Sequence, residues 1–81
     1  MRQMKSDYGS IINVIQHIIL KNGWEYYVTE APDEDGIFFA LVYGHETELG
    51  SVSLDEIRPY ISSRTNDLAE LMPAPQWEWV S

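Results

Sequence analysis

The stretch from Trp24 to Leu54 constrains the fold most, because it contains three successive strand-like runs separated by turn residues. Short runs rich in aromatic and β-branched residues, bounded by Gly and Pro, are typical of β-strands. The expected strands are about Trp24–Glu30, Ile37–Tyr43 and Thr47–Ser53. Pro32–Gly36 and Gly44–Glu46 have the composition of hairpin turns, and Gly50 is expected to mark a bulge. The middle run is apolar on both faces, which favours a central strand covered on both sides.

Acidic residues surround this middle run, and no Lys or Arg occurs between Trp24 and Leu54. The acids that flank it are Glu30, Asp33, Glu34, Asp35, Glu46 and Glu48. The whole chain has a formal net charge of −8. Such a surface disfavours direct nucleic-acid binding, since that affinity comes mainly from Lys and Arg meeting phosphate. It favours a basic protein partner, whose association is accelerated by electrostatic steering.

The segment before this stretch is rich in apolar residues, which predicts an N-terminal helix over about Tyr8–Lys21. Ser6 or Asp7 can cap this helix, its apolar residues recur with i, i+3, i+4 spacing, and the Asn-Gly pair at 22–23 resembles a helix stop. Many of the residues are β-branched, which lowers helix propensity, so a strand over Ile11–Ile19 is the alternative. The wide apolar face of the helix indicates a central helix that the sheet covers on one side and the C-terminal segment on another, with a homodimer or partner surface as the alternative.

The last third of the chain predicts a short helix, a second helical turn and a final strand. A capping box of Ser53 and Glu56 starts the helix, and Pro59 ends or kinks it. The second helical turn is expected over Leu68–Met72, and alternation predicts a strand over Gln76–Val80. That strand is expected either to join the sheet or to pack its two indoles on the N-terminal helix.

The predicted element order is therefore α-β-β-β-α-β, in one α+β domain over residues 1–81. The long N-terminal helix packs on an antiparallel sheet of three to four strands, and residues 1–6 are expected to fray. The longest apolar cluster, Ile11–Leu20, is interrupted by polar residues and is shorter than the roughly 20 residues of a bilayer span. No secretory cleavage site follows the basic residues near the start. We therefore expect a cytoplasmic protein without membrane contact.

The sequence contains no recognisable metal or catalytic motif. His45 stands beside Glu46 at a predicted loop tip, but the only other histidine, His17, lies on the predicted helix, and a metal site needs more convergent ligands. Asp33–Gly36 starts like a calcium loop and lacks the later oxygen ligands. The chain has no cysteine, so it has no thiolate site. We expect no catalytic residue, no metal, no cofactor and no enzymatic activity.

One part of the chain resembles a known family. Asp33-Glu34-Asp35-Gly36, the apolar strand after it and the run Glu48–Ile57 are similar to the hairpin and capped helix of a family of small proteins of unknown function found on plasmids and phages. The resemblance covers about residues 33–57 and implies a mobile-element setting, with no catalytic residue to carry over. In size, acidity and lack of cysteine the chain is also similar to phage-encoded inhibitors of host defence and to bacterial immunity proteins.

These features predict a small acidic inhibitor or adaptor that acts by binding. It would block a basic, nucleic-acid-binding surface of a host defence protein, such as a CRISPR or restriction component, in the host cytoplasm, with carboxylates standing where phosphates would. The expected partner-binding residues are Asp33, Glu34, Asp35, Glu46 and Glu48, with Tyr27 or Trp79 as an apolar anchor. The alternatives are an immunity or antitoxin protein that neutralises a toxin, and a homo-oligomeric structural module.

Overall fold

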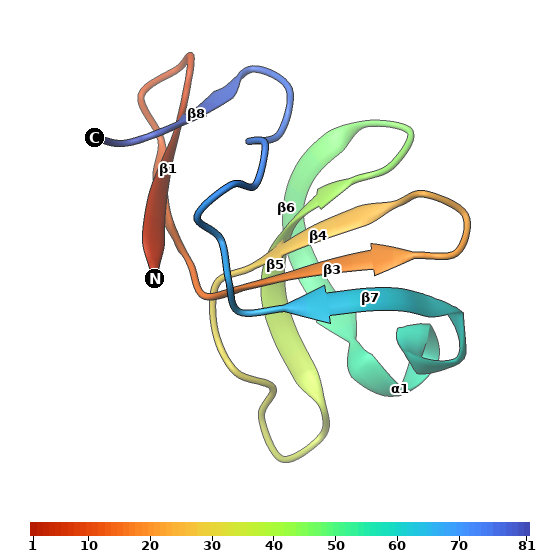
Figure 1. Ribbon diagram of the computed structural model, residues 1–81. Helices are drawn as coiled ribbons and strands as arrows, with labels where there is room; N and C mark the ends of the chain where they lie inside the picture. Colours follow the sequence, from red (N-terminus) through yellow and green to blue (C-terminus); the bar gives the residue numbers. More distant parts are fainter.

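The fold consists almost entirely of β-strands in two antiparallel sheets (Figure 1). The computed structural model describes all residues, Met1–Ser81. The strands are β1 (Arg2–Ser6), β2 (Ile11–Val14), β3 (Gln16–Leu20), β4 (Glu25–Val28), β5 (Ile37–Tyr43), β6 (Thr47–Ser53), β7 (Ile61–Thr65) and β8 (Trp77–Trp79). A short helix, α1 (Leu54–Ile57), and a 3-10 helix, η1 (Arg58–Tyr60), connect β6 to β7. The strand order is β2-β1-β8 in the smaller sheet and β6-β5-β4-β3-β7 in the larger one.

The three strands predicted between residues 24 and 54 are confirmed as β4, β5 and β6, and β5 and β6 have the predicted bounds. They pair in sequence order as antiparallel hairpins, with Leu41 opposite both Tyr27 and Leu49. The pairing of β5 with β6 continues through Gly50 without a change of register, so the predicted bulge at Gly50 is wrong. An unshifted ladder keeps side chains alternating cleanly between the two faces along both strands.

The turn between β5 and β6 contains a glycine that the packing requires. The amide of Gly44 donates to the carbonyl of Glu46 at 3.0 Å, which closes the predicted turn. A Cβ at Gly44 would come within 2.6 Å of ring carbons of Trp24, closer than real side chains approach. The same indole meets the ring of His45 edge to face, with centroids 5.3 Å apart. The turn therefore lies directly against an aromatic side chain.

The N-terminal helix predicted over Tyr8–Lys21 is wrong, and the chain is mostly β rather than α+β. That segment forms two strands, β2 and β3, which are separated by Ile15. Ile and Val are stiff at χ1 and pack well on a pleated surface, so strand formation overrides the helix-like spacing. Pairing with β1, β4 and β7 supplies the backbone hydrogen bonds. The alternative of a strand over Ile11–Ile19 lies nearer to the structure, and the homodimer surface on this helix is removed with the helix.

Hairpin turns occupy the two positions that sequence patterns assigned to the ends of that helix. Gly9 and Gly23 have φ values of 89° and 91°, a left-handed conformation that glycine adopts without steric cost. The hydroxyl of Ser6 accepts hydrogen bonds from the amides of Tyr8 and Ser10 at 3.2 and 3.0 Å, so it holds the β1–β2 turn rather than capping a helix. The Asn-Gly pair at 22–23 belongs to the β3–β4 hairpin, for which it is a strong signal.

Both ends of the chain join the smaller sheet. Arg2–Ser6, which the sequence predicts to fray, forms its central strand β1 between β2 and β8. The strand predicted over Gln76–Val80 is confirmed as β8, but it pairs with β1 instead of joining the larger sheet. Leu68–Met72 is a loop rather than the predicted helical turn, and its first side chain is buried. The larger sheet gains β3 and β7 instead, so the predicted sheet of three to four strands is also wrong.

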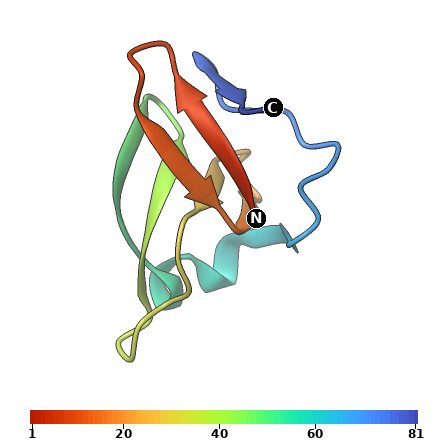
Figure 2. The same ribbon diagram turned by 90° about the vertical axis from the view of Figure 1, so that its left-hand side faces the viewer.

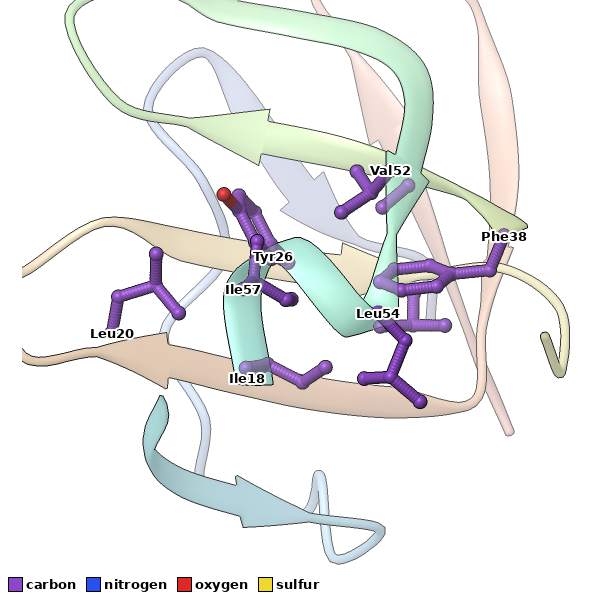
Figure 3. Packing of buried hydrophobic residues seen from close by; sticks show 9 residues of the cluster. Ile18, Leu20, Tyr26, Phe38, Val52, Leu54 and Ile57 are labelled. Atoms are coloured by element: carbon purple, nitrogen blue, oxygen red, sulfur yellow. The ribbon is translucent and has the colours of Figure 1, made fainter. Parts of the chain in front are cut away.

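A helix-side core lies between the larger sheet and α1 (Figure 3). Its nine buried residues are Ile18, Leu20, Tyr26, Val28, Phe38, Ala40, Val52, Leu54 and Ile57. Leu54 and Ile57 of α1 lie over the side chains that the strands present (Figure 3). Ser53 occupies the predicted N-cap position without a side-chain cap hydrogen bond, and Pro59 lies in η1, so α1 ends after one turn. Neither helical element has the length or the apolar character of a membrane-spanning helix.

An intersheet core lies between the two sheets. It consists of Met4, Val14, Tyr27, Leu41, Leu68 and Ala74. Figure 2 shows the β1–β2 hairpin lying over one face of the larger sheet. This hairpin covers only part of the sheet, because Ile37 and Phe39 of β5 are 36% and 39% exposed on the same face. The predicted two-sided cover of the middle strand therefore holds at Leu41 but not along its whole length.

Candidate functional site

Three of the predicted partner-binding acids lie in an ordered turn between β4 and β5. The carboxylate of Asp33 accepts hydrogen bonds from the amides of Asp35 and Ile37, both at 2.9 Å. The amide of Gly36 donates to the carbonyl of Asp33 at 2.9 Å, so the carboxylate of Asp33 shapes the turn. Glu34 and Asp35 are exposed and accept no hydrogen bond through their side chains. The turn therefore presents two unpartnered carboxylates on a fixed backbone.

Two further acids lie beside this turn, because α1 begins there. The amide of Leu54 donates to the carbonyl of Gly36 at 2.8 Å, which fixes the start of α1 against the end of the turn. Asp55 and Glu56 follow directly in the first turn of α1, and both are exposed. We call the exposed acids at this end of the larger sheet the turn cluster; it consists of Asp33, Glu34, Asp35, Asp55 and Glu56. Figure 1 shows the β4–β5 turn and α1 at the same end of the sheet.

Glu46 and Glu48, the other two predicted acids, lie at the opposite end of the larger sheet. They belong to the β5–β6 turn and to the first half of β6, and both are exposed. The seven residues of β5 separate this turn from the β4–β5 turn, a span of about 20 Å at the usual rise per residue of a strand. The structure therefore does not bring the five predicted acids into one patch, but divides them between two ends of one sheet.

Few of these acids have a cationic partner. Of the thirteen acids in the chain, only Glu25 and Asp55 lie within 4.0 Å of a basic group. The Asp55–Arg58 pair joins exposed side chains 3.5 Å apart, a kind of ion pair that stabilises folds little. The guanidinium of Arg2 lies 4.2 Å from the ring centre of Trp79 and donates to the carbonyl of Leu68, so it pairs with no acid. Both acidic ends thus keep their negative potential.

Neither aromatic residue predicted as an apolar anchor is freely exposed. Tyr27 is 1% exposed in the intersheet core, and its hydroxyl donates to the carbonyl of Met72 at 3.1 Å. Trp79 is half-buried, and its indole N–H donates to the carbonyl of Leu71 at 2.6 Å. Both side chains hold the loop before β8 against the sheets. Alternation along the strands gives the face of each residue, but only the unpredicted smaller sheet determines that this face is covered.

Buried His17 and Tyr27 form, with partly exposed Glu25, a polar group that the sequence pattern did not indicate. His17 is 1% exposed, its Nε2 lies 2.9 Å from Oε1 of Glu25, and its ring centre lies 4.9 Å from that of Tyr27. Burial lowers the pKa of His17, and the hydrogen bond and charge of Glu25 oppose that effect. Burial also raises the pKa of Tyr27, as do Glu25 and Tyr43. Neutral His17 therefore donates from Nε2 to the carboxylate of Glu25, which gives this buried nitrogen a hydrogen bond.

This polar group lines neither cavity of the molecule, and no three His, Cys, Asp or Glu side chains are grouped closely enough to hold a metal ion. A β3–β4 hairpin through the Asn-Gly pair at 22–23 would have placed His17 and Glu25 on one face, since the His17–Tyr27 and Ile19–Glu25 pairs are two steps apart in the ladder. The helix assignment hides that relation.

A groove opens between the two sheets, at the end of the larger sheet that carries Glu46. Its volume is about 220 Å³, and four of its nine lining residues are apolar: Tyr8, Leu41, Leu49 and Trp77. The others, which include Ser6, Glu48 and Gln76, are polar. Tyr8 is 89% exposed at the tip of the β1–β2 turn, and Leu49 is 42% exposed on β6. Exposed apolar side chains beside a groove are typical of a protein-binding surface. A second hollow, of about 440 Å³, lies around Leu20, Lys21, Asn22 and Tyr60.

Comparisons with known proteins return nothing for this chain: no protein-family model, no curated protein and no solved structure matches it. The resemblance to a mobile-element family therefore stays a prediction.

Proposed function

We propose that this protein is a non-enzymatic inhibitor or adaptor of the cytoplasm that binds a basic, nucleic-acid-binding surface of a partner protein. A host defence protein, such as a CRISPR or restriction component, is the kind of partner that fits the acidic character of the chain. The observation that carries the proposal is the turn cluster: Glu34 and Asp35 stand exposed on a hydrogen-bonded turn, next to Asp55 and Glu56. Carboxylates on a rigid backbone can occupy positions that nucleic-acid phosphates take on a partner.

The two acidic ends of the larger sheet support the same proposal. Clusters of like charge on a protein surface attract an oppositely charged surface before contact and orient the encounter. The turn cluster and the Glu46–Glu48 end lie on one sheet, about 20 Å apart by the strand rise. A basic groove of comparable length on a partner could engage both ends. Because most of these acids have no internal cation, their charge is available for a partner.

The test begins with identifying the partner, by affinity capture from the native host and mass spectrometry. Association kinetics with the captured protein are then measured by surface plasmon resonance at several salt concentrations. In the double variant Glu34→Lys and Asp35→Lys we expect the association rate constant to fall about tenfold or more at low salt, and its salt dependence to flatten. Asp33 stays unchanged, because its carboxylate holds the turn.

The matched control is the double variant Glu70→Lys and Glu78→Lys, which changes the net charge by the same amount at exposed positions outside the turn cluster. It should slow association much less than the turn variant. Equal rate constants for wild type and both variants would contradict the proposal. A second readout is competition: the protein should displace labelled nucleic acid from the partner. Capture of a toxin whose nucleic-acid binding is unaffected would favour an immunity or antitoxin protein instead.

A further inference from the structure

The outer edge of β6 differs from the other three strand edges of the molecule. β6 is seven residues long and continuous in register, and its sequence contains no Pro, Lys or Arg. The other edge strands, β2, β7 and β8, have four, five and three residues, and β7 also carries Arg64 and faces a register shift in β3. Natural proteins protect sheet edges by short strands, bulges, Lys or Pro. β6 therefore offers the longest and least protected edge.

Half of the backbone groups of β6 point outward from the sheet. The bonds from Gly44 N to Glu46 O and from Leu54 N to Gly36 O, at the two ends of the ladder, show that even-numbered positions face β5. Since antiparallel strands alternate, the odd-numbered positions direct their N–H and C=O groups to the open edge. These positions are Thr47, Leu49 and Ser51; Ser53 is the N-cap residue of α1, where the backbone carbonyl accepts the first hydrogen bond of the helix. No turn, loop or cap hydrogen bond uses the backbone of Thr47, Leu49 or Ser51.

The two faces of this edge have different chemistry. Leu49 is opposite Leu41 of the intersheet core, so the side chains of odd-numbered positions lie on the face of the groove between the sheets, beside its apolar residues Leu41 and Trp77. Phe39, opposite Ser51, extends this face with a second exposed apolar side chain. Glu48 is opposite Val42, which packs on the helix-side core, so the Glu48 carboxylate lies on the other face. An added strand would meet apolar surface on one face and a carboxylate on the other.

We propose that β6 receives an extended, basic segment of the partner protein as an added antiparallel strand. This inference rests on the proposed function and specifies how the partner is held. Main-chain hydrogen bonds to Thr47, Leu49 and Ser51 supply affinity, and alternate side chains supply specificity. Apolar side chains of the segment pack on Leu49 and enter the groove beside Tyr8 and Trp77. Lys or Arg side chains, at the positions between them, meet Glu48 on the opposite face.

Charge complementarity distinguishes this occupant from a second copy of the chain. Two copies paired through β6 would bring together molecules that each carry a net charge of −8, with Glu48 near the interface. Like charges across a pairing edge are destabilising. A basic segment gains from the same field, and its apolar residues cover Leu49 and Phe39, which are otherwise 42% and 39% exposed.

The probe is a capped synthetic peptide in which valine and lysine alternate over seven positions. In an added antiparallel strand, the residues opposite Thr47, Leu49 and Ser51 have their side chains on the groove face and their N–H and C=O groups directed toward β6. The valines occupy these positions, so their N–H groups bond to β6, whereas the N–H groups of the lysines point away from it. N-methylation of the valines should weaken binding about tenfold or more, because it removes inter-strand hydrogen bonds, whereas N-methylation of the lysines should change affinity less than about threefold.

Fluorescence anisotropy of the labelled peptide measures these affinities, and amide NMR of the protein should show slowed hydrogen exchange at Thr47, Leu49 and Ser51. Equal effects of the two methylation patterns, or no binding of the unmethylated peptide, would overturn the proposal. In the protein, Ser51→Pro removes an N–H group that points to the open edge, and it leaves the hydrogen bonds between β6 and β5 in place. It should abolish peptide binding, and Ser51→Ala, which keeps the N–H, should bind like wild type. The peptide pair leaves the protein unchanged, so the test does not depend on Ser51→Pro folding.

The same variants separate this inference from the proposed function. Loss of partner binding in the Glu34→Lys and Asp35→Lys variant, with full binding in folded Ser51→Pro, would overturn the added strand and leave the electrostatic function standing. The reverse pattern would overturn the electrostatic function and support the added strand. Sedimentation that detects a dimer in wild type but not in Ser51→Pro would assign the edge to a second copy and overturn the basic segment.

Discussion

The two hydrophobic cores of this protein are built from different parts of the chain and by different means. The helix-side core comes from one continuous stretch, Ile18–Ile57, and all nine of its residues are apolar or aromatic. The intersheet core joins the start of the chain, at Met4, to its end, at Ala74. It also lies beside the buried His17, and it depends on side-chain hydrogen bonds to the loop before β8.

This difference separates two ways of stabilising a small β protein. Local hairpins and one helical turn can bury apolar area without closing a long loop, so the helix-side core depends mainly on the hydrophobic effect. The intersheet core closes a loop over most of the chain, and its apolar residues are fewer. Hydrogen bonds from Tyr27 and Trp79 to the carbonyls of Met72 and Leu71 tie that loop down. The comparison predicts that truncating an apolar side chain lowers stability most in the helix-side core, and that removing a side-chain hydrogen bond lowers the stability of the intersheet core.

Truncation of Phe38 should give the largest effect. Phe38 is 1% exposed in the helix-side core, and Phe38→Ala should lower the free energy of unfolding by about 3–5 kcal/mol, because it removes buried area and leaves a cavity. The matched control is its neighbour on the other face, Phe39→Ala, which should cost less than about 1 kcal/mol since Phe39 is partly exposed. Urea unfolding followed by tryptophan fluorescence measures both. Similar losses would contradict the assignment of Phe38 alone to the core.

The sequence predicts the helix-side core much better than the intersheet core. Phe38, Ala40 and Val52 belong to strands whose bounds follow from apolar runs and Gly-Pro turns, and alternation alone gives their shared face. The pairing of β1 with β8 brings together residues more than seventy positions apart, and no local signal specifies it. The Ile-rich segment satisfies both a helical and a strand pattern in a short window, so only tertiary pairing decides between them.

The candidate site divides in the same way. Exposure of Asp33, Glu34 and Asp35 follows from turn chemistry that is visible in the sequence. The groove does not, because its two walls come from β6 and from the smaller sheet, whose strands β1 and β2 the sequence does not reveal. Asp55 lies next to the β4–β5 turn because the β5–β6 ladder ends at the Ile37–Ser53 pair and the amide of Leu54 then donates to the carbonyl of Gly36. Local pattern predicts which residues are charged and exposed, and topology determines their neighbours.

Removal of one hydroxyl tests the polar character of the intersheet core. Tyr27→Phe loses the hydrogen bond to Met72 and should lower the free energy of unfolding by about 0.5–1.5 kcal/mol. Its neighbour provides the control, because the hydroxyl of Tyr26 on the opposite face makes no hydrogen bond within the protein, and Tyr26→Phe should change stability by less than about 0.5 kcal/mol. Hydrogen exchange should accelerate at Leu71 in Tyr27→Phe only. Equal stability of the two variants would show that the loop is held by apolar packing instead.

Mild acid should weaken the intersheet core through His17. Burial lowers the pKa of this imidazole below its usual value, which is about 6.5. Below that pH the unfolded chain binds a proton that the folded chain does not, so stability is full above about pH 6.5 and falls as the pH drops toward the folded-state pKa. One such group contributes at most about 1.4 kcal/mol per pH unit to that slope. The free energy of unfolding, measured with urea between pH 7 and 5, should depend less steeply on pH in His17→Gln than in wild type. His45→Gln, which changes the exposed histidine, is the control and should keep the wild-type dependence. A slope that is unchanged in His17→Gln would mean that His17 has the same pKa in the folded and unfolded chain, and a steeper slope would mean that His17 is charged in the folded protein and paired with Glu25.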